Sequence, residues 1–320
     1  MLVLSRADVE QLLDLDRLRE AVASAMADLS AGRVSMPPRI AAIVPERDAL
    51  LAAMPAYLPS SGALATKLVS LFPRNTDRPT HQAVIVVFDP ENGGPLALMD
   101  GEAITAARTA AGSALATDLL AREDSDRLIV IGTGVQARAH LRAVSRVRKF
   151  GSICVVGRDV EKAKALAKEL GAGASVNIEE AVREGDVVCA CTHSAEPVVR
   201  RDWLKPGAHV NSVGYNTAGR EVDGATFRDA LVVVESRSAA LAPPPAGSND
   251  IAMAIAEGAM TREHVHAELG ELVSRTRPGR ADGRQITLYK SVGVAVQDAA
   301  AAAMVLESAR KAGVGRTIDL

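Results

Sequence analysis

Five short apolar runs, separated by helical or loop segments, occupy the middle of the chain and constrain its fold more than any other feature. They lie at residues 128–131, 153–156, 187–191, 209–213 and 231–234. Uninterrupted apolar strands that alternate with helices are typical of a parallel sheet with both faces covered. We therefore predict that this half of the chain is a doubly wound α/β domain.

A glycine-rich loop follows the first of these runs directly. Gly132, Gly134 and Ala137 form a G-x-G-x-x-A pattern between a predicted strand and a predicted helix. In dinucleotide-binding folds the first glycine permits a tight turn, the second lets backbone N–H groups approach a pyrophosphate, and the third position lets helix and strand pack closely. The pattern in this context predicts a Rossmann-type nicotinamide site; the alternative is a glycine turn in another α/β fold.

The end of the second strand bears on which dinucleotide binds. An acidic residue there would bind the ribose 2′-hydroxyl of NAD, whereas an arginine would accommodate the 2′-phosphate of NADP. The sequence has Arg158, which can form paired hydrogen bonds with phosphate, and then Asp159, which can cap a helix that starts at Val160. We predict that NADP(H) is preferred and that NAD(H) is possible; the alternative for Arg158 is a solvated surface charge.

The two ends of the chain are predicted to form an α+β domain. Residues 66–72 alternate as a strand does, and the runs 83–89 and 95–99 flank a turn typical of antiparallel hairpins. Alanine-rich helices are expected over residues 105–120 and 291–311, the second packing back on the first third of the chain. We expect residues 1–118 plus 290–320 to form this domain, completed by the C-terminal helix, and residues 119–289 to form the Rossmann domain.

Composition argues against several classes of function. The 320 residues include 37 Lys and Arg against 39 Asp and Glu, with one Trp, three Tyr and four Phe, which argues against a nucleic-acid partner. No apolar run approaches the roughly 20 residues of a membrane span, and the early charges argue against a signal peptide. Cys154, Cys189 and Cys191 lie in apolar runs, which predicts buried thiols and a cytoplasmic location, and no Cys/His spacing predicts a metal site.

Three cations stand at positions that surface charge does not obviously explain. Arg39 follows a double proline, Lys67 lies in an alternating strand, and Arg108 lies in an alanine-rich helix. Spacing alone favours a solvated side chain at each position.

Several segments taken together resemble the ornithine cyclodeaminase/mu-crystallin family. They are Pro38-Arg39, residues 66–73, 79–83, 98–105 and 108–111, the glycine loop with residues 135–137, Glu196-Pro197, and residues 210–214 and 290–293. The resemblance covers nearly the whole chain in order. It implies a homodimer whose first domain binds the substrate and forms the dimer contact, while a Rossmann domain holds the nicotinamide cofactor.

The resemblance also implies roles for individual residues. Arg39, Lys67 and Arg108 would bind the substrate carboxylate, which a planar guanidinium can hold by two contacts, and Thr80 and His81 would lie near the substrate. His81 has the pKa range of an acid or base, although a lone histidine in a strand is more typically structural. The cofactor contacts that the resemblance implies are Thr133, Val135, Gln136, Arg158, Thr192 and Val213. To these we add, as expected contacts, Gly132 and Gly134 of the glycine loop and Gly157, Asp159, His193 and Ser291.

One position departs from the pattern of the cyclodeaminases. Those enzymes carry a catalytic aspartate where this chain has Asn216, and an amide cannot act as a general base near neutral pH. Ornithine cyclisation therefore loses its base unless Asp223 replaces it. Reduction of a cyclic iminium needs only a fixed carboxylate and a hydride; Asn216 would orient the imine nitrogen, and Lys67 would act as a proton donor or as an electrostatic clamp.

We therefore predict NAD(P)H-dependent reduction of small cyclic α-imino acids, of the pyrroline-2-carboxylate or piperideine-2-carboxylate type, to L-amino acids. Lys67, Arg108 and Asn216 are the expected catalytic residues. The alternatives are an amino-acid dehydrogenase that works through an open-chain imine, an ornithine cyclodeaminase, and a non-enzymatic binding protein like mu-crystallin.

Overall fold

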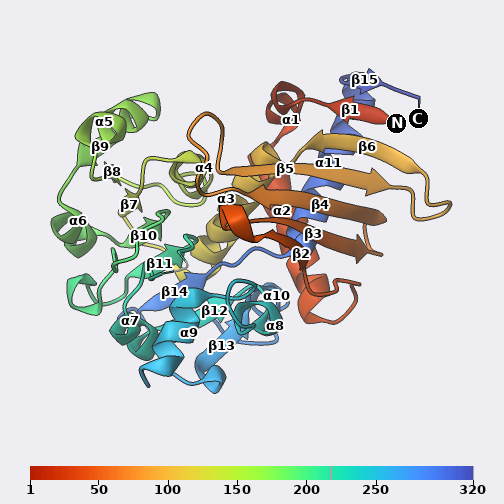
Figure 1. Cartoon of the computed structure of the whole chain (residues 1–320). Helices are drawn as coiled ribbons and strands as arrows, with labels where there is room; N and C mark the ends of the chain where they lie inside the picture. Colours follow the sequence, from red (N-terminus) through yellow and green to blue (C-terminus); the bar gives the residue numbers. More distant parts are fainter. Residues whose placement is uncertain (217, 320) are drawn as a thin grey trace. The chain divides into compact units, whose positions relative to one another are not determined.

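A computed structural model describes residues 1–216 and 218–319, and the chain in it divides into two compact units (Figure 1). The first unit comprises residues 1–108 and 294–320, and the second comprises residues 109–293. The domain limits at 118/119 and 289/290 stay a prediction. Among the described residues, no helix is both long enough and apolar enough to cross a bilayer.

The first unit is built on a mixed sheet with the strand order β15-β1-β6-β5-β4-β3-β2. The strands are β1 (Leu2–Leu4), β2 (Ile40–Val44), β3 (Ala49–Leu58), β4 (Ala63–Leu71), β5 (His81–Phe88), β6 (Pro95–Asp100) and β15 (Arg316–Thr317). The hairpin predicted around residues 90–94 is confirmed, because β5 pairs with β6 in antiparallel register. The helices of this unit are α1 (Arg6–Leu12), α2 (Leu15–Ser30) and α11 (Ala295–Ala312), with the 3-10 turn η1 (Pro45–Arg47).

The long helix α11 packs on one face of this sheet, against β3, β4 and β5, and α2 lies beside it (Figure 1). The C-terminal helix therefore returns to the first third of the chain, as predicted. It begins four residues later than expected, because the N–H groups of Ser291, Val292 and Gly293 donate to other parts of the second unit. Gly293 also has a φ of +71°, which an α-helix does not accommodate.

The second unit is built on an all-parallel sheet with the strand order β13-β12-β14-β11-β10-β7-β8-β9. The strands are β7 (Arg127–Ile131), β8 (Ser152–Val156), β9 (Gly173–Ser175), β10 (Val187–Ala190), β11 (His209–Ser212), β12 (Leu231–Val234), β13 (Val265–Glu268) and β14 (Thr287–Lys290). The five predicted apolar runs are all strands of this sheet. Leu128 and Val130 of β7 face one core and Ile129 and Ile131 face another, so both faces are covered and the doubly wound fold is confirmed.

Helices connect these strands and cover the two faces of the parallel sheet. They are α4 (Val135–Val144), α5 (Val160–Glu169), α6 (Ile178–Glu184), α7 (Gly224–Asp229), α8 (Arg237–Ala240), α9 (Asn249–Ala256) and α10 (Leu269–Val273), with the 3-10 turns η2 (Arg201–Trp203) and η3 (Arg262–His264). Helix α3 (Gly101–Leu120) contains the division between the units at residues 108/109. The strand order reverses between β7 and β10, and the crevice at the carboxyl ends of such strands is where α/β folds bind ligands.

Candidate active site

Two cations and a carboxylate form a buried cluster inside the first unit. The Lys67 ammonium lies 2.8 Å from Asp298 Oδ2, and Arg108 Nε donates to Asp298 Oδ1 over 2.8 Å. Arg108 Nη1 also donates to Gln297 Oε1 over 3.1 Å, and Lys67 Nζ donates to Thr105 Oγ1 over 3.4 Å. Lys67 is 3% exposed, Arg108 4% and Asp298 1%. The reading of Lys67 and Arg108 as solvated side chains, which spacing alone favours, is therefore wrong.

Local structure explains how these groups meet. Alternate side chains of β4 face helix α11, and Lys67 shares that buried face with Ala65 and Val69. The alanine-rich surface of α11 lets the helix approach the sheet closely. Asp298 lies in the first turn of α11, where the helix dipole stabilises a negative charge. Because charged side chains are rarely buried without a partner, the pairing with Asp298 accounts for the burial of both cations.

Burial and charge together determine the protonation states in this cluster. The pKa of Lys67 is lowered to about 8: burial is the main cause, the Asp298 carboxylate opposes it, and the charges of Arg108 and Arg39 add to the lowering. Burial alone would raise the pKa of Asp298, but the charges of Arg108 and Lys67 outweigh it and hold that pKa below its usual range. At neutral pH the cluster therefore carries excess positive charge, which suits a carboxylate ligand.

Arg39, Thr80 and His81 also belong to the first unit. Arg39 stands directly before β2, and its charge acts on Lys67. Thr80 is exposed in the loop before β5, and His81 begins that strand. Burial, together with the charges of Lys67 and Arg108, lowers the pKa of His81 to about 4. His81 is thus neutral near pH 7, where it can form hydrogen bonds but cannot donate a proton as an imidazolium.

The glycine loop of the second unit has the geometry of a phosphate site. Gly132 has a φ of +123°, and a Cβ there would lie 2.6 Å from the carbonyl oxygen of Cys191. Gly134 is the N-cap of α4 and makes no side-chain cap, while a Cβ at Gly134 would meet no atom within 4 Å. The first N–H groups of α4 are therefore not capped by a side chain, and the space beside Gly134 is open, which suits a phosphate; Val135 is exposed next to it. These residues fit the pyrophosphate of a dinucleotide.

The end of β8 carries the residues that bear on the adenosine ribose. A Cβ at Gly157 would lie 2.7 Å from Thr133 Cγ2, so the strand end and the glycine loop are packed closely. Asp159 caps α5, and its Oδ1 accepts hydrogen bonds from the backbone N–H groups of Glu161 and Lys162, each over 3.1 Å. Arg158 is exposed and makes no hydrogen bond or ion pair within the described part of the chain. Its guanidinium is thus able to contact an anion, whereas the Asp159 carboxylate is engaged in capping.

A buried carboxylate organises the loops at the ends of β10 and β11. Glu221 Oε1 accepts hydrogen bonds from Thr192 N (2.5 Å) and Thr192 Oγ1 (2.7 Å), and Oε2 accepts from Ser212 Oγ (2.9 Å) and Gly214 N (2.7 Å). Lys290 at the end of β14 donates to Ser212 Oγ over 3.0 Å and to the Gly214 carbonyl over 2.8 Å. Thr192, an expected cofactor contact, is held in place by this network.

Asn216 also joins two loops of the second unit. Its Nδ2 donates to the carbonyl of the exposed His193 over 2.9 Å, and its Oδ1 accepts from Ala218 N over 2.8 Å. Asp223 caps α7, with Oδ1 accepting from Thr226 N over 2.9 Å and from Thr226 Oγ1 over 2.6 Å. The Asp223 carboxylate is thus engaged in capping α7. A role of Asn216 toward an imine nitrogen stays a prediction.

The other expected cofactor contacts of this unit are partly or fully buried. Val213 directly follows β11 and packs against a hydrophobic core, and Gln136 lies in the first turn of α4. The Ser291 hydroxyl donates to the buried Glu235 over 2.5 Å, and Glu235 also accepts from Val292 N and Gly293 N, each over 3.0 Å. Glu235 therefore holds the segment that follows β14. The Ser291 hydroxyl donates its hydrogen bond to Glu235, so it is not available to donate one to a cofactor.

Five buried charged residues of these networks were assigned no role from the sequence. They are Glu221, Glu235, Lys290 and Asp298, together with Asp250, whose Oδ2 lies 3.1 Å from the Lys290 ammonium. A signal was present for some of them, because Glu235 directly follows the apolar strand β12 and Asp298 is the one carboxylate in the alanine-rich stretch 295–306. Such positions place a charge where an apolar residue is expected.

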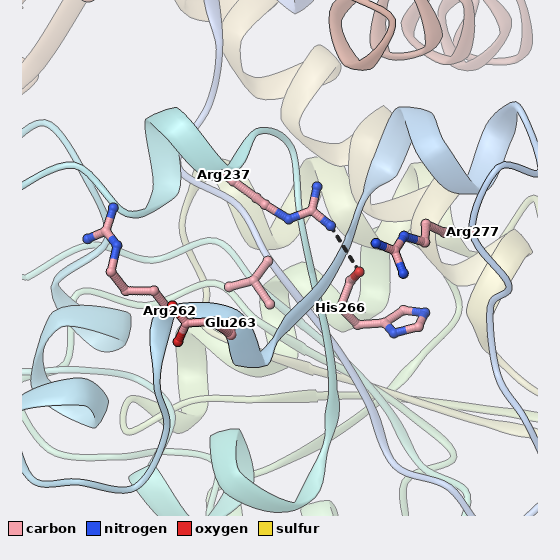
Figure 2. Close-up of a pocket in the computed structure, with 6 residues that line it drawn as sticks. Arg237, Arg262, Glu263, His266 and Arg277 are labelled. Carbon is pink, nitrogen blue, oxygen red and sulfur yellow. Dashed lines mark hydrogen bonds between the residues drawn. The ribbon is translucent and has the colours of Figure 1, made fainter.

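A surface cavity of the second unit lies apart from all of these residues. It has a volume of about 410 Å³ and is lined by Arg237, Arg262, Glu263, Val265, His266 and Arg277 (Figure 2). Arg237 donates to the His266 carbonyl over 2.9 Å and pairs with Glu271. None of the candidate site residues lines this cavity, so the cavity does not mark the proposed chemistry.

Comparison with known proteins relates both units to characterised enzymes. A sequence profile of the ornithine cyclodeaminase/mu-crystallin family matches residues 1–313. The ketimine reductase mu-crystallin of Mus musculus is 39% identical over 282 residues, which are 87% of this chain and 86% of that protein.

Two solved structures are also similar over their whole length. The Thermococcus litoralis Δ1-pyrroline-2-carboxylate reductase in complex with NADH and L-proline is 40% identical, with a TM-score of 0.94 over 99% of this chain and 100% of the other. An archaeal alanine dehydrogenase dimer with bound NAD is 33% identical, with a TM-score of 0.92 over 100% of this chain and 99% of the other.

Proposed function

The chain belongs to the ornithine cyclodeaminase/mu-crystallin family, and we propose that it reduces small cyclic α-imino acids such as pyrroline-2-carboxylate to the corresponding L-amino acids. It is an NAD(P)H-dependent oxidoreductase that acts on a C=N group. The observation that carries the proposal is the buried pair of cations, Lys67 and Arg108, because this pair suits the one charged group that all such substrates share.

The residues of the two units have separate tasks in this reaction. Arg108, Lys67 and Arg39 bind the substrate carboxylate and so fix the position of the adjacent C=N bond. A nicotinamide dinucleotide, when bound at the glycine loop, supplies the hydride that the C2 carbon accepts. Lys67, whose pKa of about 8 leaves it mostly protonated at pH 7, acts as a proton donor to a neutral imine or as an electrostatic clamp.

The same residues bear on the two alternative enzyme activities, an amino-acid dehydrogenase and an ornithine cyclodeaminase. An amino-acid dehydrogenase acting through an open-chain imine would use the same carboxylate site, and an archaeal alanine dehydrogenase is among the similar structures. Deaminating cyclisation needs a base where this chain has Asn216, and the Asp223 carboxylate is engaged in capping α7. Cyclic imine reduction needs no base at that position.

A spectrophotometric panel tests the proposal directly. The purified protein is assayed for consumption of NADPH and NADH with pyrroline-2-carboxylate, piperideine-2-carboxylate and open-chain 2-oxo acids, with and without ammonia. We expect ammonia-independent oxidation with the cyclic imines. Turnover only with a 2-oxo acid plus ammonia would indicate a dehydrogenase, release of ammonia from ornithine a cyclodeaminase, and cofactor binding without any turnover a non-enzymatic binding protein.

Arg158 is proposed to favour NADPH over NADH, whereas the relatives above were solved with NADH or NAD. We expect Arg158→Gln to weaken NADPH binding about 10- to 100-fold, because charge-assisted hydrogen bonds to the 2′-phosphate are lost, and to leave NADH binding nearly unchanged. Fluorescence titration measures both dissociation constants. The control is Lys162→Gln, an exposed cation on α5 that pairs with Asp159. An unchanged ratio of the two constants in Arg158→Gln would remove the proposed preference.

The first unit also supports a homodimer. Ile40, Ala53, Leu68 and Val84 lie directly opposite one another on four adjacent strands, so they share the sheet face opposite to that of Lys67. Ile40 is 70% exposed and Val84 is 40% exposed. Contiguous exposed apolar groups mark interaction surfaces, and we propose that a second copy of the chain covers this one.

We expect Val84→Glu to convert the dimer to a monomer, because a buried unpaired carboxylate opposes association of the apolar face. Sedimentation velocity measures the change. Val176→Glu is a matched control, since Val176 is an exposed valine of the second unit. A Val84→Glu protein that remains dimeric at micromolar concentration would exclude this face as the interface.

The three free thiols further support a cytoplasmic location.

A further inference from the structure

Asp298 is the anion of the buried cluster, and both of its carboxylate oxygens are used. Oδ1 accepts from Arg108 Nε over 2.8 Å, and Oδ2 lies 2.8 Å from the Lys67 ammonium. The three groups come from three elements, α11, α3 and β4, so a single carboxylate ties these elements together. The Arg108–Asp298 contact joins residues 190 positions apart in the sequence.

The contacts of Arg108 show which edge of its guanidinium remains available. Asp298 engages Nε and Gln297 engages Nη1, both from α11. Among the described residues Nη2 has no hydrogen-bond partner. A guanidinium held by Nε can still present its Nη atoms to a second carboxylate. Asp298 therefore orients Arg108 and leaves the side of the guanidinium that a ligand would use.

The charge of Asp298 also matters for Lys67, which faces cations on two other sides. Arg108 on α3 and Arg39 before β2 both favour loss of the Lys67 proton, as burial does. His81 on β5 is neutral near pH 7 because its pKa is about 4. Of these four residues, only Asp298 on α11 favours the protonated, ammonium form of Lys67. A neutral residue at position 298 would leave two buried cations repelling each other.

We propose that Asp298 is a positioning residue for imino-acid reduction, whose two oxygens hold the Lys67 ammonium and the Arg108 guanidinium as one receptor for the substrate carboxylate. This inference rests on the proposed function. Each Asp298 oxygen contacts one of the two cations, so Asp298 acts through them, and its negative charge would repel the substrate carboxylate. It acts by fixing their direction and by keeping Lys67 charged.

The test compares Asp298→Asn and Asp298→Glu with the wild type in steady-state reduction of pyrroline-2-carboxylate across pH. For Asp298→Asn we expect KM to rise about 30-fold or more, with a smaller change in kcat, because the receptor loses its alignment. The wild-type kcat/KM should fall above about pH 8 as Lys67 loses its proton. Removing the negative charge lowers the Lys67 pKa, so this alkaline limb should move at least about one pH unit lower. Protonation of the free imine substrate also affects the pH profile, but it does so equally for the wild type and every variant. The difference between their profiles therefore reports on the protein.

Asp28→Asn is the matched control, because Asp28 is also a buried carboxylate of the first unit and pairs with Arg33 over 2.7 Å. It should lose stability without any change in KM or in the pH limb. Asp298→Glu keeps the negative charge, so its kcat/KM should fall at the same alkaline pH as that of the wild type, while its KM rises. This variant provides the test if Asp298→Asn does not fold. If the folded Asp298 variants keep the wild-type KM and the wild-type pH dependence, the inference is overturned and the proposed function is not. Absence of imine turnover by the wild type would overturn the proposed function and the inference together.

Discussion

Arg108→Ala is expected to decrease kcat/KM for the cyclic imino acid by about 10²- to 10⁴-fold. The variant loses a two-point contact with the substrate carboxylate, and each hydrogen bond to a charged group contributes about 1.5 to 3 kcal/mol. Cofactor affinity should remain within about twofold of the wild type, because the glycine loop belongs to the second unit and Arg108 to the first. Steady-state assays and fluorescence titration of NADPH measure the two quantities.

Arg33→Ala provides the control for Arg108→Ala. Arg33 also pairs with a buried carboxylate of the first unit, Asp28, but its own side chain is exposed. Its loss should affect stability slightly and turnover not at all, since a partly exposed ion pair contributes little. Equal losses of turnover and cofactor affinity in Arg108→Ala would contradict the role assigned to Arg108, as would a variant that retains more than about a third of its activity.

Gly134→Asp is expected to abolish cofactor binding without destabilising the protein. Gly134 has φ −89° and ψ −168°, which any residue adopts, and a Cβ there would meet no atom within 4 Å. Aspartate is a better N-cap than glycine by a few tenths of a kcal/mol, so Tm should stay constant or rise slightly. Its carboxylate would accept the N–H groups of α4 that a pyrophosphate needs and would repel the phosphates. We expect both dinucleotides to bind at least about 100-fold more weakly.

Gly134→Ser separates charge from capping. Serine caps a helix as aspartate does but carries no charge, so its loss of cofactor affinity should be smaller than that of Gly134→Asp. Calorimetry of NADPH and NADH binding, together with thermal unfolding of each variant, measures the effects. Binding by Gly134→Asp within about threefold of the wild type would show that the pyrophosphate does not lie at the N-terminus of α4.

Much of the second unit was predictable because its signals are local. The apolar runs, the glycine spacing and the capping residue Asp159 each act within a few residues, and the structure confirms the strands and the cap. Three strands escaped prediction for the same reason. They are β9 (Gly173–Ser175), β13 (Val265–Glu268) and β14 (Thr287–Lys290), and none of them has the uninterrupted apolar pattern of the other strands. Their pairing with β8, β11 and β12 decides that they are extended.

The sequence by itself determined the class of fold, the glycine loop and the two cations on which the proposed carboxylate site depends. Only the tertiary structure decided that Lys67 and Arg108 are buried and that Asp298 stands between them. Propensity and periodicity act over short stretches of chain, whereas the charge state of a buried lysine depends on whatever packs against it. Here that neighbour comes from a helix 231 residues further along the chain, and no local pattern around Lys67 contains that information.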